Sequence, residues 1–349
     1  MAKKVLLIQE KIMNYRVPVF NELAKNVDLT VLYSSGEKPK DANFKTICIP
    51  TRKMIFRIHT KNIYSLAQKY DIVICMADFS YIYFKLLYKL PHKYKLIFWG
   101  IGVSASYNMR YDQDSQVAQI IFNILKKADA MVFYCSYPVD KYSKMGIERE
   151  KLFVANNTVL IKDIEEKEKN SIIFIGTLYK QKKINYLLDG YLNAFKKNSD
   201  IYNLKIIGDG DEYENIQKWI TDNSLENKIE LLGSIYDEGV LAEHFSEALL
   251  CFSPDQAGLS VLKSMGYGVP FVTHKNAITG GEIFNINDGV NGILMDDFNQ
   301  IENIILDSME NKEKYIEMGR KAKEHYKANR TVDKMVSGFI DAINYVESK

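Results

Sequence analysis

The sequence predicts an α/β fold made of two doubly wound domains, each built on a parallel sheet. Short runs of β-branched and aliphatic residues alternate with segments whose apolar residues recur every three or four positions. The alternation stops at residues 162–170 (KDIEEKEKN), a charged stretch without apolar periodicity, and then restarts. Strands that alternate with helices favour parallel sheets, and the restart indicates a second domain after a linker.

The first half of the chain carries six predicted strands with helices between them. The strands are expected at 5–8, 29–33, 72–76, 96–99, 130–134 and 152–155. The helices are expected at 19–26, 62–70, 79–88, 116–127 and 139–145. We assign residues 1–165 to this N-terminal Rossmann-like domain.

The second half repeats the pattern. Its strands are expected at 172–175, 204–207, 229–232, 249–253 and 271–273. Its helices are expected at 184–197, 213–222, 241–248 and 259–267, followed by helix over 312–347 with a break at 328–330. We assign 166–329 to a C-terminal Rossmann-like domain and expect the last helix, 330–349, to pack back toward the first domain.

Composition excludes several classes of protein. The 349 residues are 47% hydrophobic, and the longest apolar runs, 72–77 and 130–135, are far shorter than the roughly 20 residues that cross a bilayer. Near the start, a lysine pair precedes only four apolar residues and no small-residue cleavage site follows, unlike a secretory signal. We therefore expect a cytoplasmic location. The four cysteines lie far apart without a CxxC pair, which argues against a zinc site or a disulfide framework.

Basic residues are concentrated in the first half of the chain. Residues 1–165 hold 25 Lys and Arg against 15 Asp and Glu, whereas residues 166–349 hold 21 against 29. The densest part interleaves basic and apolar side chains: Arg52, Lys53, Met54, Ile55, Phe56, Arg57, Ile58 and Lys61. Such a mixture suits an anionic surface, here the inner face of the membrane with the protein bound peripherally. The alternative is a solvated loop before a helix. We expect no nucleic-acid partner.

The loop after the first strand excludes two nucleotide-binding classes. It reads QEKI and has no glycine, so the GxGxxG turn of a nicotinamide or flavin domain is missing, and no GxxxxGK[ST] loop occurs. Two Asp-x-Asp pairs, Asp112 with Asp114 and Asp209 with Asp211, resemble metal motifs. A tight turn in which Asp caps the helix near residue 213 explains the second pair. We therefore expect no bound metal and no cofactor.

Glycines and lysines follow the predicted strands of the second domain, at the edge where ligands of such sheets bind. Gly176 ends one strand and precedes TLYKQKK, which places Lys182 or Lys183 near a bound anion; the alternative is a solvated lysine at a helix start. The segment 252–270 (FSPDQAGLSVLKSMGYGVP) ends a strand and starts a helix directly after Gly258. A helix N-terminus favours negative charge, and this glycine allows a ligand to approach the backbone.

Four segments occur in order: residues 128–159, IIFIGTLYKQKK, LKIIGDGDEYENI, and GLSVLKSMGYGVPFVT with GGEIFNINDGVNGIL. Together they resemble the family 4 glycosyltransferases of the GT-B fold, which are nucleotide-sugar enzymes with two facing Rossmann-like domains. The resemblance covers nearly the whole chain. It implies an enzyme of bacterial surface-polysaccharide biosynthesis (capsule, O-antigen or similar).

The resemblance implies that the second domain binds a nucleoside-diphosphate sugar. Lys182 would contact the donor diphosphate, because lysine acts as a point charge on phosphates. The implied donor-binding residues are Gly176, Thr177, Lys182, Gly208, Gly233, Gly258, Leu259, Ser260, Lys263 and Glu282. The implied catalytic residues are Lys182, Asp255 and Asp78, and the acceptor side holds Tyr15, Arg16, Gly100 and Gly102. For Arg16 and Asp78 the alternative is helix capping.

Several positions depart from the family's pattern. Asp255 and Lys263 stand where the family has two glutamates. Since a lysine has no acceptor, either ribose recognition is rearranged or Lys263 serves the phosphates. Thr177 replaces an arginine, and Ile101 stands where a histidine is thought to contact the donor sugar. The glycine pair expected after the first strand is missing.

From these features we expect a retaining, metal-independent hexosyltransferase that moves a sugar from a nucleoside diphosphate to a carbohydrate or lipid-linked acceptor. Domain closure would orient the acceptor hydroxyl, and Lys182 with helix amides would stabilise the departing diphosphate. Two alternatives stay open. One is a GT-B sugar-nucleotide epimerase, which would isomerise a free nucleotide sugar. The other is a noncatalytic GT-B subunit that binds a partner enzyme or a glycan.

Overall fold

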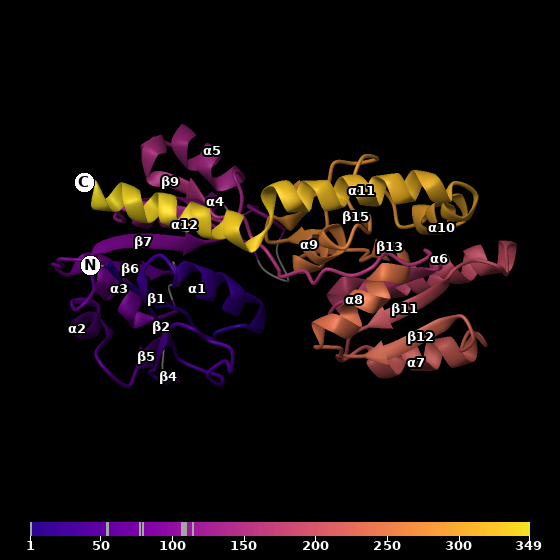
Figure 1. Cartoon of the computed structure of the whole chain (residues 1–349), viewed down its shortest axis with the longest axis horizontal. Helices are drawn as coiled ribbons and strands as arrows, with labels where there is room; N and C mark the ends of the chain where they lie inside the picture. Colours follow the sequence, from indigo (N-terminus) through magenta and orange to yellow (C-terminus); the bar gives the residue numbers. More distant parts are fainter. Residues whose placement is uncertain (1, 54–55, 77, 79, 106–109, 114) are drawn as a thin grey trace. The chain divides into compact units, whose positions relative to one another are not determined.

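The computed structural model describes residues 1–349 except 1, 54–55, 77, 79, 106–109 and 114 (Figure 1). The chain divides into two compact units. The N-terminal unit comprises Met1–Ser104, Asp112–Leu160 and Thr331–Lys349, and the C-terminal unit comprises Ala105–Tyr111 and Ile161–Arg330. The divisions therefore fall after 160 and 330, whereas the sequence places them after 165 and 329.

The charged segment that the sequence identifies as a linker belongs to the C-terminal unit. Ile161 and Ile164 pack against a buried cluster of that unit, which includes Tyr267. Glu166 also pairs with Lys323 at 2.8 Å. Ile164 escapes the sequence analysis because it is isolated among charged residues, and Ile161 directly precedes the charged segment.

A parallel sheet of seven strands lies at the centre of the described part of the N-terminal unit, in the order β3-β2-β1-β6-β7-β8-β9. Val5 and Leu7 of β1 face one buried cluster, and Leu6 and Ile8 face the other, as expected for a strand covered on both sides. The strands are β1 (Lys4–Ile8), β2 (Asp28–Tyr33), β3 (Lys45–Cys48), β6 (Ile72–Cys75), β7 (Lys95–Gly100), β8 (Ala130–Phe133) and β9 (Leu152–Val154). The helices are η1 (Asn14–Arg16), α1 (Val17–Leu23), α2 (Ile63–Ala67), α3 (Ile82–Lys89), α4 (Ser115–Leu125), α5 (Tyr137–Lys144) and η2 (Arg149–Lys151).

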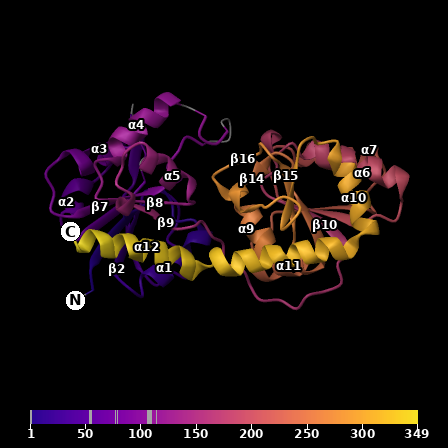
Figure 2. The ribbon, with the colours of Figure 1, turned by 90° about the horizontal axis from the view of Figure 1, so that it is seen from above.

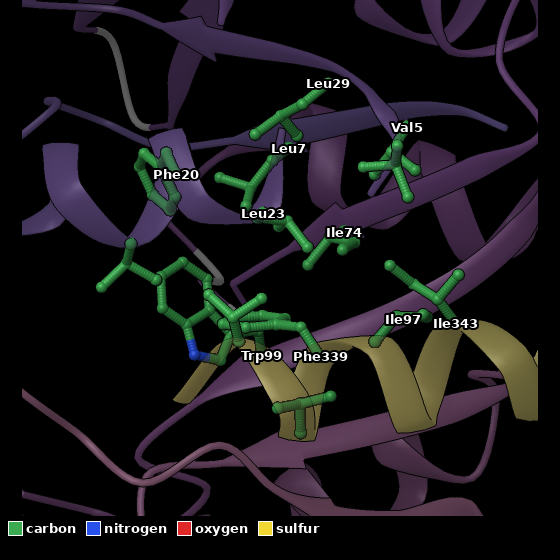
Figure 3. Packing of buried hydrophobic residues seen from close by; sticks show 14 of the residues in the cluster. Val5, Leu7, Phe20, Leu23, Leu29, Ile74, Ile97, Trp99, Phe339 and Ile343 are labelled. Carbon is green, nitrogen blue, oxygen red and sulfur yellow. The ribbon is translucent and has the colours of Figure 1, made fainter. Parts of the chain in front are cut away.

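The last helix, α12 (Val332–Glu347), packs on the N-terminal unit, where it lies against α1, β8 and β9 (Figure 2). Phe339 and Ile343 of this helix lie in the same cluster as Trp99 and Ile97 of β7 (Figure 3). The rings of Trp99 and Phe339 are 5.0 Å apart, centroid to centroid, in an edge-to-face arrangement. The end of the chain therefore completes a core that begins at the first strand.

The C-terminal unit has a parallel sheet of six strands in its described residues, in the order β12-β11-β10-β13-β15-β17. This is the doubly wound order 3-2-1-4-5-6, whose topological switch point lies between β10 and β13. The strands are β10 (Ser171–Ile175), β11 (Asn203–Ile207), β12 (Ile229–Gly233), β13 (Ala248–Phe252), β15 (Phe271–His274) and β17 (Gly292–Met295), with β14 (Gln256–Ala257) paired to β16 (Ile278–Thr279). The helices are η3 (Lys180–Lys182), α6 (Ile184–Lys197), α7 (Tyr213–Asp222), α8 (Glu238–Glu247), α9 (Leu259–Gly266), η4 (Glu282–Asn285), α10 (Gln300–Glu310) and α11 (Lys312–Asn329).

The elements that the sequence analysis did not expect include β3, β17 and α10, and the basic segment differs as well. Beside β3, it holds an antiparallel hairpin of β4 (Thr51–Lys53) and β5 (Arg57–His59), where the sequence indicates a loop. The strands have three residues each and no alternation of apolar and polar side chains, so no pattern marks them. Met54 and Ile55 lie outside the described residues. Among the helices that the structure describes, none combines the length and the apolar character needed to cross a bilayer.

Candidate functional site

Loops at the carboxyl edge of the C-terminal sheet are joined by backbone hydrogen bonds. The Gly176 amide donates to the Ile207 carbonyl (3.0 Å), and the Leu178 amide donates to the Asp209 carbonyl (2.9 Å). A Cβ on Gly208 would lie 1.9 Å from the Gly176 carbonyl oxygen, so this position requires glycine. Gly208 thus allows the loop after β11 to pack closely against the loop after β10.

Lys182 lies at the switch point, in the turn after β10. Its side chain is buried, and a Cβ on Gly176 would lie 2.9 Å from its Nζ. Burial lowers the pKa of Lys182 to about 8. The rings of Phe174 and Tyr179 lie 5.9 Å from the ammonium, and among the described residues no hydrogen-bond or ion-pair partner is recorded for it. Burial of an unpaired ammonium is unfavourable, so binding of an anion beside it would lower the free energy.

The neighbouring Lys183 has a different environment. It adopts the left-handed conformation at φ +52°, and its Nζ lies 2.6 Å from a carboxylate oxygen of Asp255, which is buried. The Asp255 backbone carbonyl accepts a hydrogen bond from the Ile278 amide at 2.9 Å. The structure therefore separates the two lysines that the sequence leaves equivalent: Lys183 neutralises Asp255, and Lys182 stays available.

The start of α9 follows β13, on the other side of the switch point. The first amides of a helix have no partner within the helix, and here they belong to Leu259 and Ser260. Apart from its chain neighbours, no atom of the described residues lies within 4 Å of the position of a Cβ on Gly258, so there is open space beside the backbone. The Ser260 hydroxyl oxygen is buried and has no hydrogen-bond partner among the described residues. These groups are all donors, and they suit a negatively charged ligand.

Lys263 on α9 is bound to a carboxylate. Its Nζ lies 2.6 and 2.7 Å from the two carboxylate oxygens of Glu238, at the start of α8. This ion pair neutralises the charge of Lys263, and the two predicted alternatives, rearranged ribose recognition or a phosphate contact from Lys263, stay predictions. Gly233 ends β12 with φ +68°, and within the part of the chain that the structure describes no atom beyond its chain neighbours lies within 4 Å of its Cβ position.

Two more predicted donor-side residues lie in different loops, Glu282 after β16 and Thr177 after β10. Glu282 is buried at the start of η4, which packs against α9, and its carboxylate accepts a hydrogen bond from the Gly280 amide at 3.0 Å. Thr177 is exposed beside Gly176.

In the described part of the chain, no three or more His, Cys, Asp or Glu side chains, those of the Asp-x-Asp pairs included, form a group that could hold a metal ion. Asp209 accepts a hydrogen bond from the Gly210 amide at 2.7 Å, and α7 has Glu212 at its N-cap without a side-chain cap, so the predicted capping by Asp is wrong. Asp112 pairs with Lys141 at 2.5 Å. Asp114 lies outside the described residues.

The predicted acceptor-side residues belong to the N-terminal unit. Arg16 is buried, with its guanidinium carbon 5.0 Å from the ring centroids of Tyr15, Trp99 and Tyr134, and one nitrogen contacts the Met335 sulfur at 3.4 Å. It therefore joins the segment after β1 to α12, and although it stands at the N-cap position of α1, its side chain makes no capping hydrogen bond.

Asp78 accepts hydrogen bonds from the amide and the hydroxyl of Ser80 (2.8 and 2.6 Å), and α3 has no side-chain cap. Capping therefore explains neither Asp78 nor Arg16. Gly100 ends β7, and a Cβ on Gly102 would lie 2.4 Å from the ring of Phe133.

A family model for "Glycosyl transferases group 1" matches residues 158–325. An uncharacterized glycosyltransferase of Haemophilus influenzae is 30% identical over 185 residues, 49% of this chain and 48% of that protein. An uncharacterized 41.2 kDa protein in the cps region of Klebsiella pneumoniae is 26% identical over 341 residues, 86% of this chain and 88% of that protein. The crystal structure of Anabaena Alr3699/HepE in complex with UDP has a TM-score of 0.73 at 14% identity, covering 98% of this chain and 99% of that chain.

Residues 158–325, within or next to the C-terminal unit, are therefore similar to the group 1 glycosyltransferases. The expected family and the expected α/β fold of GT-B type, with two Rossmann-like units and parallel sheets, are confirmed. The chain spans about half the length of the Haemophilus relative.

Reasoning from the sequence misses Glu238 of this candidate site, and it misses the ion pair that Lys183 forms. Glu238 lies 25 positions before Lys263. The sequence offers one hint: Lys263 stands where the family has a glutamate, so a carboxylate at this place has to come from another element. The role of Lys183 in neutralising Asp255 is hidden for the same reason, since 72 residues separate the pair.

Proposed function

We propose that the chain is a retaining glycosyltransferase that moves a hexose from a nucleoside diphosphate to a carbohydrate or lipid-linked acceptor in polysaccharide biosynthesis. The observation that carries the proposal is the buried ammonium of Lys182 without an anionic partner among the described residues, beside the switch point of the C-terminal sheet. An anion bound there would also meet the free amides and the buried Ser260 hydroxyl at the start of α9.

The reaction requires that negative charge on the departing diphosphate be stabilised as the bond from sugar to phosphate breaks. Lys182 supplies a positive charge in a dry environment, where it acts more strongly than in water. The amides of Leu259 and Ser260 supply fixed donors. The leaving phosphate accepts the proton of the acceptor hydroxyl, so no general base is required. We propose that no metal takes part, because these donors can replace one.

The structural neighbour from Anabaena was crystallised with UDP, and the Klebsiella relative lies in a cps region. We therefore choose UDP as the first probe and a surface polysaccharide as the acceptor class. Calorimetric titration of the whole chain with UDP and GDP, followed by assay of UDP released from a panel of nucleotide sugars, tests the proposal. Absence of binding and of slow hydrolysis across the panel would contradict it.

The pairing of Lys263 with Glu238 supports a second candidate, a noncatalytic subunit that binds a glycan or a partner enzyme. In that case the chain would release no UDP from any nucleotide sugar, with or without acceptor. An epimerase would instead convert a free nucleotide sugar into its isomer without an acceptor. Chromatography of the sugar nucleotides after incubation separates all three outcomes.

A further inference from the structure

A second polar cluster lies in the N-terminal unit, at the carboxyl ends of β1 and β2. It consists of Glu10, Ser34, Arg57, His59 and Tyr81, and the donor-side residues contribute nothing to it. The Ser34 amide donates to the Glu10 carbonyl at 2.9 Å, and the Arg57 amide donates to the Ser80 carbonyl at 2.7 Å. The β4–β5 hairpin thus joins the loops after β1, β2 and β6, and β1 and β6 flank the switch point of this sheet.

The inner part of the cluster contains an imidazole with an unused nitrogen. His59 Nε2 lies 2.9 Å from the Ser34 hydroxyl oxygen, and His59 is 9% exposed between the rings of Tyr81 and Tyr83. Burial lowers the pKa of His59 to about 4, so the ring is neutral near pH 7. Its Nδ1 is buried and lacks a hydrogen-bond partner among the described residues. A buried nitrogen without a hydrogen bond destabilises the fold unless a ligand or a water molecule bonds to it.

The outer part of the cluster is accessible and carries both signs of charge. Arg57 pairs with the Glu10 carboxylate and donates a hydrogen bond to the Tyr81 hydroxyl at 3.0 Å. The side chains of Arg57 and Glu10 are 36% and 52% exposed. A guanidinium has five N–H donors and a carboxylate about four acceptor positions, so most of this capacity faces solvent. Because the two charges cancel, the pair favours a neutral ligand with several hydroxyl groups over an isolated ion.

We propose that this cluster binds adjacent hydroxyl groups of a glycan or polyol acceptor. Glu10 accepts from one hydroxyl, Arg57 donates to its neighbour, and the Ser34 hydroxyl makes a third hydrogen bond. His59 is a positioning residue, because it orients the Ser34 hydroxyl through Nε2. The assignment of this ligand as the acceptor rests on the proposed transferase function, whereas the binding of hydroxyl groups does not.

Saturation-transfer NMR on the full chain tests the proposal, with methyl α-glucopyranoside, methyl α-galactopyranoside and glycerol as probes and UDP as an internal reference. We expect transfer to at least one probe, and the sugar and glycerol arms distinguish a glycan from a polyol. Glu10→Gln should weaken that binding about tenfold and Ser34→Ala about fivefold, as expected for one charged and one neutral hydrogen bond. The UDP signal should not change in either variant.

Asp28→Asn is the matched control, because Asp28 forms a similarly exposed ion pair with Lys45 (2.6 Å) at the start of β2. Arg57→Lys keeps the charge and removes the forked donor, and it serves as a second variant if Glu10→Gln unfolds. His59→Gln, which retains a hydrogen-bonding group for Ser34, should keep more affinity than His59→Phe at equal stability.

Saturation transfer to none of the three probes, or affinities within twofold of the unmodified chain in both Glu10→Gln and Arg57→Lys, would overturn the proposal. Equal affinities of His59→Gln and His59→Phe would overturn the positioning role. Binding of a probe without any binding of UDP or GDP would contradict the transferase function and leave this site in place.

Discussion

Replacement of Lys182 by methionine should make the protein more stable and less able to bind a nucleotide. Methionine has a similar length and no charge, so the variant removes the ammonium without opening a large cavity. The buried ammonium has no recorded partner among the described residues, and burial lowers its pKa from 10.5 to about 8. In the folded chain, no described residue therefore compensates this charge.

The size of the effect on stability follows from the change in pKa. The folded chain holds this proton less tightly than the unfolded chain, so folding is disfavoured by up to about 3 kcal/mol below pH 8. This cost declines as the pH rises from 8 to 10.5 and then disappears. At pH 7 we expect Lys182→Met to raise the free energy of unfolding by up to about 3 kcal/mol, and the gain should shrink above pH 8.

The effect on binding has the opposite sign. Loss of charged contacts to a diphosphate costs roughly 1.5 to 3 kcal/mol, which weakens UDP binding by roughly 10-fold to 150-fold. Turnover of the donor should fall by about 10²-fold or more, as for one positioned charge on a reacting group.

Urea unfolding followed by the fluorescence of Trp99 and Trp219, together with calorimetric titration of UDP, measures both effects. Lys180→Met is the matched control, because Lys180 lies in the same turn with an exposed side chain. A Lys182→Met variant that is less stable than the unmodified chain, or that binds UDP with unchanged affinity, would refute the reasoning.

Three further predictions concern other parts of the molecule. Gly208→Ala should lower the free energy of unfolding by about 2 to 4 kcal/mol, because its Cβ would overlap a carbonyl oxygen of the next loop; unchanged urea unfolding would contradict this. Replacing the exposed Arg52, Lys53 and Lys61 by Ser should weaken binding to vesicles containing phosphatidylserine by about two orders of magnitude, at roughly 1 kcal/mol for each charge, while Arg57 is retained because it pairs with Glu10. Flotation at low and high salt measures this, and an unmodified chain that does not float would show the hairpin to be merely solvated. Addition of EDTA or Mg²⁺ should leave donor turnover unchanged, and activity lost to the chelator and restored by one metal would argue for a metal site.

Most strands of the two sheets could be predicted because their pattern is local, whereas β3 and β17 were not expected from the sequence. Residues 5–8 and 172–175 are continuous apolar runs, and such runs form parallel strands covered on both faces, whatever the rest of the chain does. The break between the last two helices was predictable for the same reason, and it lies at Arg330. The hairpin at 51–59 could not be predicted, since its three-residue strands are held by contacts with loops after three other strands.

The sequence by itself determined most of the strands and helices, the family, and the positions of the glycines and lysines that follow the strands, because these depend on periodicity and on short motifs. Only the tertiary structure decided which charged groups are neutralised. Lys182 and Lys183 are adjacent in the chain, yet Asp255 reaches only Lys183, and Glu238 reaches Lys263 from another helix. The charge state of a site depends on distances between residues that are remote in sequence, since ion pairs form over a few ångströms in space.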